Sequence, residues 1–203
     1  MIFKYREAAA VLFVSPVFQY FPLEARQGGY LPTNEESAIK IIQQVLLAVG
    51  EMHRRGVVHS DIKPDNILYD TMTGDTIVAD FGLAKVMDAD GKVGDPHGGT
   101  VGFMAPEVWQ VYKSTDPRTL YNTYLGPPID MYSIGALMVW LATNEYFDEG
   151  SLGLLELEWR IRTCEISLTD NFKVLVRPLL DPNPNKRPSA EEMLCRLKVK
   201  ETS

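Results

Sequence analysis

The chain has 203 residues, enough for one globular domain with a sizeable core. Apolar residues make up 45% of it and charged residues 23%, which excludes a disordered or fibrous chain. Twenty Lys and Arg against 27 Asp and Glu give a net charge of −7, which argues against non-specific binding to nucleic acid or to anionic membranes.

The cysteine content favours a reducing compartment. The two cysteines, Cys164 and Cys195, form neither a disulfide framework nor a metal-ligand spacing. The longest apolar run, residues 134–142, has about half of the roughly 20 residues that a membrane-spanning helix needs. We therefore expect an intracellular protein, of the cytoplasm or the nucleus, with no membrane segment.

The first element expected is a strand. Residues 11–21 are rich in β-branched and aromatic side chains, and Pro22 ends the run. Lys4 and Arg6 before the apolar stretch 8–14 outline a secretory signal, but an acidic residue interrupts it and no cleavage site follows. A buried strand is the better interpretation.

A long amphipathic helix is expected next. Thr33 and Glu36 have the spacing of a capping box, in which each side chain bonds the backbone of the other residue. Two arginines suit the C-terminal end of the helix, and Gly56 stops it. His53, near that end, is interpreted as solvated or paired with the helix dipole. The apolar positions at helical spacing are Ile39, Ile42, Val45, Leu46, Val49 and Met52.

A small hairpin and a loop should follow. Short strands are expected at residues 57–58 and 67–69, then a turn over 70–75 and a returning strand over 76–79. Residues 88–99, with four glycines and one proline, are expected to form a loop.

The rest of the chain reads as helical from about residue 129. Residues 131–143 are apolar nearly all round, which predicts a buried central helix. A further helix is expected over 172–180, and Ser189 should cap a last one. The order predicts a mostly helical α+β unit without a long linker.

Five polar or glycine residues, taken together, are suited to one type of reaction. Taken alone, the Asp and Asn residues among them are common turn formers. In their order and spacing, Asp80 and Asn66 offer the hard oxygen ligands that Mg²⁺ prefers, and Asp61 can orient a hydroxyl and take its proton. Lys63 can neutralise a moving phosphoryl group, and Gly82 lets the chain turn beside the metal. This arrangement predicts phosphoryl transfer.

Five motifs in this sequence resemble those of the eukaryotic protein kinases, specifically of their C-terminal lobe. His59–Asn66 resembles the family's catalytic loop, and residues 80–82 resemble its metal-binding motif. Residues 99–107 resemble the end of its activation segment. Residues 130–135 look like the start of the family's central buried helix. Residues 181–190 look like the last conserved motif of the family's domain.

The resemblance implies a fold and a division of the chain. The fold is α+β, a protein-kinase-like large lobe that is mainly helical, with a small catalytic-loop hairpin and one residual small-lobe strand. Residues 1–22 would be the residual strand and the hinge, and residues 23–203 the C-terminal lobe.

The resemblance also assigns roles, with ATP and Mg²⁺ as cofactors. Glu107 would pair with Arg187 and anchor the activation segment, and Asp130 would accept backbone N–H groups of the catalytic loop. Thr100 would lie in the substrate-facing loop, and Pro64 with it favours the serine/threonine type. The residues assigned to the nucleotide and its metal are Asn66, Leu68, Asp80 and Gly82.

The sequence departs from the family upstream of residue 56, where no glycine-rich loop and no Val-Ala-x-Lys strand is present. Without them the adenine would be contacted by protein from one side only and would be open to water on the other. Phe81 would lie on an exposed apolar face. We therefore expect the chain to belong to a longer polypeptide, or to work against a partner protein that covers this face.

Two further departures concern regulation. Ser60 stands where most of the family has an Arg that would bind a phosphorylated loop, and Thr100 is the only hydroxyl residue between Asp80 and Glu107. Activation by loop phosphorylation is therefore not expected. Residues 113–128 lengthen the usual spacing and are expected to form an exposed insert that could serve as a docking site.

The function implied is that of a serine/threonine protein kinase, which transfers the γ-phosphate of ATP to a hydroxyl of a protein substrate. As an isolated 203-residue chain, little or no activity is expected. The alternative is a catalytically inactive pseudokinase without a small lobe, which regulates another kinase by binding it. Neither interpretation involves nucleic acid or a membrane.

Overall fold

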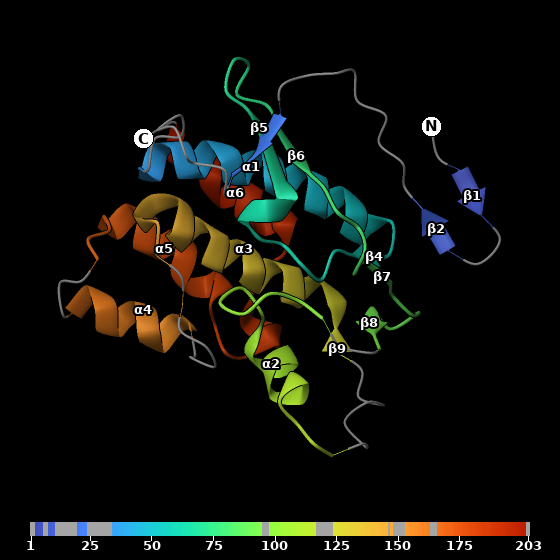
Figure 1. The fold of residues 1–203 in the computed structure, drawn as a ribbon. Helices are drawn as coiled ribbons and strands as arrows, with labels where there is room; N and C mark the ends of the chain where they lie inside the picture. The colour runs from blue at the N-terminus through green and yellow to red at the C-terminus, as the bar shows by residue number, and fades with distance from the viewer. Residues whose placement is uncertain are drawn as a thin grey trace.

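Helices dominate the architecture. The computed structural model describes residues 3–5, 8–10, 20–23, 34–94, 98–116, 124–145, 147, 153–162 and 166–201. Figure 1 shows α3 in the middle of the molecule, where it packs against α1 and α5, while α6 packs against α1. The helices in these ranges are α1 (Glu35–Arg54), α2 (Pro106–Tyr112), α3 (Gly126–Thr143), α4 (Gly153–Arg162), α5 (Asp170–Leu179) and α6 (Ala190–Glu201).

The strands are short and pair antiparallel. β3 (Tyr20–Pro22), β5 (Ile67–Asp70) and β6 (Thr76–Val78) form a three-stranded sheet in the order β3-β5-β6. The remaining strands form two-stranded pairs, which are β1 (Phe3–Tyr5) with β2 (Ala8–Ala10), β4 (Val57–Val58) with β7 (Lys85–Val86), and β8 (Lys92–Val93) with β9 (Tyr124–Leu125). The described residues thus form a mixed, mostly helical structure, consistent with the α+β expectation.

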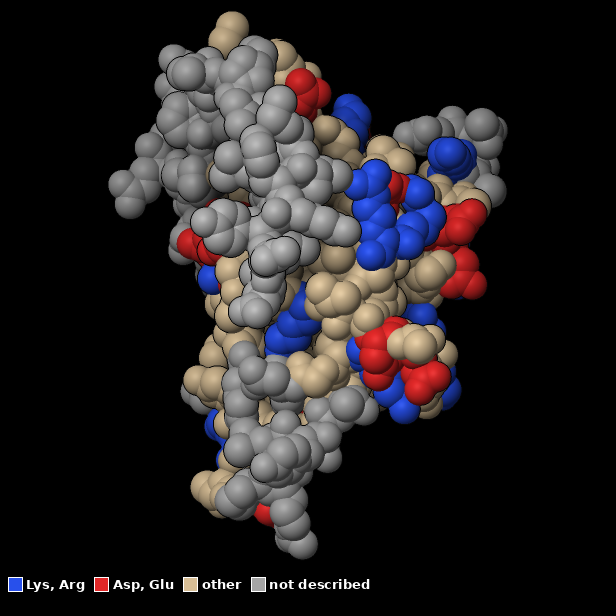
Figure 2. Space-filling model, turned by 90° about the vertical axis from the view of Figure 1, so that its right-hand side faces the viewer, with Lys and Arg blue, Asp and Glu red and all other residues tan. Residues whose placement is uncertain are grey.

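The surface near β4, β7 and β8 carries charges of both signs. Figure 2 looks onto this end of the molecule and shows Lys and Arg next to Asp and Glu rather than a field of one sign. None of the helices in the described ranges is both long and apolar enough to cross a bilayer.

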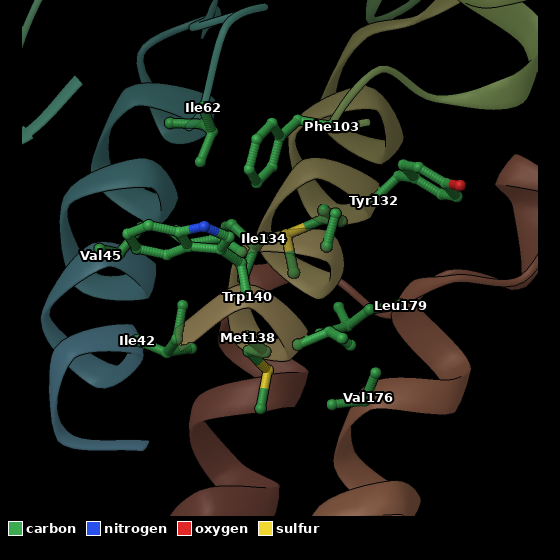
Figure 3. Close-up of a cluster of buried hydrophobic side chains, with 14 of the residues drawn as sticks. Ile42, Val45, Ile62, Phe103, Tyr132, Ile134, Met138, Trp140, Val176 and Leu179 are labelled. Atoms are coloured by element: carbon green, nitrogen blue, oxygen red, sulfur yellow. The ribbon is translucent and has the colours of Figure 1, made fainter. Parts of the chain in front are cut away.

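The core lies where α1, α3 and α5 meet. Every residue of α3 from Ile129 to Leu141 is buried, as its nearly continuous apolar sequence predicts. Figure 3 shows Ile42 and Val45 of α1 turned toward α3, with Val176 of α5 on the other side. α3 therefore forms a rigid support for whatever attaches to its N-terminal end.

The start of α1 differs from the prediction. Asn34, not Thr33, is the N-cap, and its side chain accepts a hydrogen bond from Ser37 N at 2.9 Å. Glu36 does not reach back to the cap but binds Lys40 one turn on, at 2.7 Å. Asn is at least as good a cap as Thr, and the helix therefore begins one residue later than predicted. The predicted stop at Gly56 is confirmed by its φ of 75°.

The hairpin is confirmed, since β5 and β6 flank a turn in which Gly74 has a φ of 79°. The loop predicted over 88–99 is wrong in part, because Lys92–Val93 forms β8. Its partner β9 lies far along the sequence, so no local pattern indicates the pairing.

Two helix starts were missed by the sequence pattern. α3 begins at Gly126 rather than near residue 129, because Pro127 and Pro128 are tolerated in a first turn. α2 begins at Pro106, after Ala105 as N-cap, within what the sequence suggested only as the end of a segment. In both helices proline occupies positions whose N–H groups have no partner inside the helix.

Two predictions are settled only in part. Within the predicted strand 11–21, residues 11–19 lie outside the described residues, and Pro22 belongs to β3 rather than ending the run before it. The predicted exposed insert 113–128 is wrong at its C-terminal end, because residues 124–128 form β9 and the first turn of α3 and none of them is exposed. Residues 117–123 lie outside the described part of the chain.

The last two helices begin at N-caps, of which Ser189 was predicted and is confirmed. Thr169 caps α5, which begins at Asp170 instead of Phe172. Ser189 and Glu192 form a reciprocal capping box at the start of α6. Glu192 N donates to Ser189 Oγ at 3.2 Å, and Ser189 N donates to Glu192 Oε2 at 2.7 Å.

Candidate active site

The predicted catalytic loop joins β4 to β5 and is folded around His59. This side chain is fully buried. Its Nε2 lies 3.0 Å from Ala79 O, and Asp61 N donates to its Nδ1 at 3.3 Å. Because Nδ1 accepts a hydrogen bond, Nε2 carries the hydrogen of the neutral ring. The imidazole thus joins the loop to the residue just before Asp80.

Asp130 of α3 fixes the backbone of the loop. Its side chain is fully buried, and it accepts hydrogen bonds from His59 N at 2.9 Å and Ser60 N at 2.8 Å. These are the contacts that the resemblance led us to expect. Ser60 has a φ of 68°, which is unfavourable for a residue other than glycine. Two charge-assisted hydrogen bonds from a rigid helix offset that cost.

His53 is a member of this arrangement that the sequence interpretation missed. Its Nε2 donates to Asp130 Oδ2 at 2.8 Å, and its side chain is only 11% exposed. Of the two roles expected, that of a solvated residue is wrong; His53 lies in the last turn of α1 and is the third donor to the Asp130 carboxylate. The partner lies 77 residues away in the sequence, and nothing local to His53 indicates it.

Asp61 lies at the centre of a compact polar network. Its Oδ1 accepts the hydroxyl hydrogen of Thr100 at 2.8 Å. Its Oδ2 lies 3.1 Å from Lys63 Nζ and accepts a hydrogen bond from Asn66 Nδ2 at 3.0 Å. Lys63 Nζ also donates to Thr100 Oγ1, at 2.9 Å. Four residues singled out from the sequence are therefore in direct contact, and Asp61 itself is buried.

Asn66 and Asp80 come from the two sides of the hairpin. Asn66 donates through Nδ2 to Asp61, to the backbone oxygen at 2.8 Å as well as to the carboxylate, which leaves its amide oxygen as an acceptor. Ala79 N donates to Asn66 O at 2.8 Å and so brings the next residue, Asp80, beside Asn66. Asp80 is exposed, has a φ of 59°, and accepts a hydrogen bond from Gly82 N at 3.1 Å.

The donor set of Asn66 and Asp80 fits Mg²⁺. An amide oxygen and a carboxylate are hard ligands, and Mg²⁺ commonly uses one or two such protein groups together with phosphate oxygens and water. The described residues contain no cluster of three His, Cys, Asp or Glu side chains that could hold a metal by themselves. The site therefore fits a metal that arrives with a phosphate ligand.

Leu68 and Phe81 flank this pair. Leu68 lies in the middle strand of the three-stranded sheet, half-buried, opposite Pro22 of β3. The ring of Phe81 lies 5.3 Å from the ring of His59, in a tilted arrangement. Phe81 is half-buried, so its contact with His59 covers part of the apolar face that we expected to be open.

Glu107 and Arg187 form the predicted ion pair. Both guanidinium NH groups donate to the carboxylate, each at 2.7 Å. Arg187 also donates to Pro128 O at 2.8 Å and to Asp181 O at 2.8 Å. It thereby links α2, the start of α3 and the turn before α6. Such a bidentate, buried arrangement satisfies the guanidinium and fixes the three segments relative to one another.

A small pocket, with room for little more than a water molecule, lies between the catalytic loop and the segment before α2. Its wall includes Ser60, Asp61, Thr100 and Phe103. Ser60 Oγ is buried there and has no hydrogen-bond partner among the described residues. A serine at this position provides a hydroxyl and no cation.

The fold and this arrangement define a kinase-type site, and comparison with known proteins places the chain accordingly. The family model of the protein kinase domain matches residues 5–197. The chain belongs to the protein kinase family.

Curated relatives are serine/threonine kinases. CBL-interacting serine/threonine-protein kinase 15 of Arabidopsis thaliana is 34% identical over 188 residues, which cover 86% of this chain and 42% of that protein. Serine/threonine-protein kinase ppk34 of Schizosaccharomyces pombe is 34% identical over 167 residues, 80% of this chain and 44% of that protein. A probable myosin light chain kinase of Dictyostelium discoideum is 32% identical over 185 residues, 87% of this chain and 54% of that protein. The chain thus spans about half the length of these relatives, or somewhat less.

Proposed function

We propose that this chain is the C-terminal lobe of a serine/threonine protein kinase domain, which transfers the γ-phosphate of ATP to a hydroxyl of a protein. The observation that carries the proposal is the network around Asp61, in which a buried carboxylate already accepts a hydroxyl hydrogen at 2.8 Å and has an ammonium group beside it. This is what a hydroxyl nucleophile and a transferred anionic group require.

Each residue of the network has a distinct task in the proposal. Asp61 orients the acceptor hydroxyl and takes its proton. Lys63, whose Nζ bridges Asp61 and Thr100, places positive charge next to the transferred group. Asn66 holds Asp61 through two hydrogen bonds and turns its amide oxygen to the metal side. Thr100 joins the substrate-facing loop to the catalytic loop, so that the two move together.

The nucleotide side of the proposal rests on Asp80 and Asn66, which would hold Mg²⁺, and on Leu68, which would lie under the adenine. When bound with ATP, Mg²⁺ neutralises charge on the phosphate oxygens. Gly82 N donates to Asp80 Oδ1 and thereby orients the carboxylate. The backbone bond from Ala79 to Asn66 fixes the distance between the two sides of the hairpin.

The proposed division of the chain keeps residues 1–22 as a residual small-lobe strand and hinge, and residues 23–203 as the lobe. The pairing of β3 with β5 supports this, because it attaches residues 20–22 to the strand that carries Leu68.

We also propose that a small lobe or a partner protein covers the face on which Leu68 and Phe81 lie. An intracellular location is proposed as well, because the described Cys195 is an exposed free thiol.

The test uses the full natural polypeptide that contains this sequence, γ-labelled ATP, Mg²⁺ and a degenerate library of Ser- and Thr-containing peptides. We expect label transfer, and we expect Asp61→Asn to lower kcat by about 10²–10⁴-fold while nucleotide binding persists. Asp65→Asn is the matched control, because Asp65 is exposed on the same loop. Equal activity of Asp61→Asn and the natural protein would reject the proposal. Absence of transfer, together with stable binding to another kinase, would favour the inactive regulatory role.

A further inference from the structure

Gln44 of α1 binds the turn of the β5–β6 hairpin through both ends of its side-chain amide. Its Nε2 donates to Gly74 O at 2.8 Å, and its Oε1 accepts a hydrogen bond from Thr76 N at 2.9 Å. The two partners lie 30 and 32 residues further along the chain, and Gln44 itself is half-buried. One orientation of the amide satisfies both groups, because only its NH₂ can face a carbonyl and only its oxygen can face an N–H.

Gln44 takes the place of a neighbouring strand at the edge of the sheet. β6 has β5 on one side and is the last strand in the order β3-β5-β6. A side-chain amide offers the same donor and acceptor as a peptide group, so Gln44 pairs with this edge as a residue of a further strand would. α1 packs along β6 (Figure 1), so the strand is held from two sides.

Asp70 closes the same turn from within. Its Oδ1 accepts hydrogen bonds from Met72 N at 2.8 Å and from Thr73 N at 3.3 Å. These bonds join residues of the turn to one another, and they would move with the hairpin if it shifted. Gln44 differs from Asp70 because it attaches the hairpin to a helix that is packed in the core against α3. Asp70 thus shapes the turn, and Gln44 fixes its position.

β6 leads from this contact to the proposed metal ligand Asp80. The strand has three residues, Thr76–Val78, and Ala79 N donates to Asn66 O at 2.8 Å just beyond its end. An extended segment this short transmits a shift at one end to the other, because an extended backbone has a fixed rise per residue. The position of Asp80 relative to Asn66 therefore depends on where Gln44 holds the start of β6.

We propose that Gln44 is a positioning residue of the nucleotide site, which sets the position of Asp80 relative to Asn66 through the edge of β6. The proposal rests on the proposed kinase function. Gln44 acts on the metal side of the site and not on the peptide side, because the loop of Asp61 is fixed separately by Asp130. Loss of the Gln44 amide should therefore raise the Mg²⁺ concentration that the site requires and leave the KM for peptide unchanged.

The first arm of the test measures amide hydrogen exchange, resolved to single residues by mass spectrometry, on the full natural polypeptide. Gln44→Met keeps an unbranched side chain and removes the amide. We expect exchange at both Thr76 and Ala79 to become about tenfold faster in this variant. Faster exchange at Thr76 alone would show that Gln44 only closes the turn, and it would overturn the proposal.

Thr76→Val is the matched control for this arm. Thr76 Oγ1 is buried and has no hydrogen-bond partner among the described residues, so the change removes a hydroxyl without breaking a bond that the structure shows. The backbone N–H that binds Gln44 remains. We expect exchange at residues 76 and 79 to stay slow in this control. Fast exchange there as well would show that any change beside the strand releases it, which contradicts a specific role of the Gln44 amide.

The second arm measures the Mg²⁺ concentration for half-maximal binding of a non-hydrolysable ATP analogue, by calorimetry, and for half-maximal phosphate transfer. Both should rise about fivefold in Gln44→Met, and neither should change in Thr76→Val. The KM for peptide should be the same in all three proteins. An unchanged Mg²⁺ requirement in Gln44→Met, whatever its stability, would overturn the proposal. If the natural protein neither binds the analogue nor transfers phosphate, the proposed function is rejected, and exchange at Ala79 alone decides whether Gln44 holds β6 against Asn66.

Discussion

Asp61 and Asp80 would supply the two carboxylates of the proposed reaction, and the protein surrounds them differently. Asp61 is buried, and three neighbouring side chains hold its carboxylate. Asp80 is exposed, and within the described residues the hydrogen bond to its carboxylate comes from Gly82, two positions on. One carboxylate is part of the packed interior, and the other sits on a local turn.

The difference follows from what each group is attached to. The loop of Asp61 is fixed by Asp130 of the buried helix α3, and α3 is joined to α2 by the Arg187 contacts. Asp80 follows β6, a short strand at the edge of the sheet. We therefore expect changes around Asp61 to alter stability and activity together, and changes at Asp80 to alter activity alone.

The largest effect is expected for Asp61→Asn. Beyond the loss of transfer, the free energy of unfolding should fall by about 1–3 kcal/mol, because Thr100 and Lys63 lose a charged partner in a buried place. Urea unfolding of the natural protein, Asp61→Asn and Asp65→Asn measures this. Equal stability of all three would show that the network does not support the fold.

The ion pair of Arg187 tests the framework behind Asp61. Arg187→Ala should cost about 3–5 kcal/mol of stability, because it leaves the Glu107 carboxylate without its partner in a mostly buried position. Arg177→Ala is a matched control, since Arg177 makes a similar two-pronged contact with Glu158, but at the surface. That variant should lose only about 0.2–1 kcal/mol. Similar losses in the two variants, measured by thermal and urea unfolding, would contradict the role of burial.

Asp80→Asn tests the other side of the comparison. Transfer should fall about 10²-fold, because the charge stabilisation supplied through the metal is weakened by several kcal/mol. The free energy of unfolding should change by less than about 0.5 kcal/mol, as is usual for exposed positions. The readouts are kcat across a Mg²⁺ titration and urea unfolding. A destabilisation as large as that of Asp61→Asn would remove the distinction between the two carboxylates.

The parts of the fold that the sequence predicts are those fixed by near neighbours. Gly56 ends α1 because glycine readily adopts its positive φ, and the capping box joins Ser189 to Glu192, only three positions away. The central helix is predictable because its apolar sequence is nearly continuous. The contacts of Asp130 with the catalytic loop and of Glu107 with Arg187 were expected through the family resemblance, since their partners are 70 to 80 residues away.

The parts that escaped prediction depend on distant or competing partners. His53 finds Asp130 only after α1 and α3 have packed, and β8 finds β9 only when the chain returns to it. At the start of α1, Thr33 was expected as the cap, but Asn34 takes that role and accepts a hydrogen bond from Ser37 N. Asn caps a helix at least as well as Thr, so the spacing of a capping box alone does not decide between two neighbouring residues.

His53→Ala should reveal how much the third donor contributes to the buried Asp130. We expect a loss of about 1–3 kcal/mol in stability and a lower kcat, because Asp130 Oδ2 keeps only the bond from His59 N. The KM for peptide should not change, since His53 lies behind the loop. Arg54→Ala, at the exposed neighbouring residue, is the control. A variant that loses stability but keeps its full kcat would show that His53 serves the fold alone.

The smallest effect is expected at the exposed start of α6. Ser189→Ala should cost about 1 kcal/mol, because it removes the cap bond to Glu192 N. The backbone N–H of Ser189 holds the pKa of Glu192 below its ordinary value of 4.5. A lowered folded-state pKa means that this stabilisation is present above the unfolded value and is lost as the pH falls through the folded value. The difference in unfolding free energy between the natural protein and Glu192→Gln should therefore shrink on acidification from neutral pH, and more so than for Glu191→Gln, which changes the same charge on the same turn. A difference that stays constant with pH would mean that the Glu192 charge does not contribute to the cap.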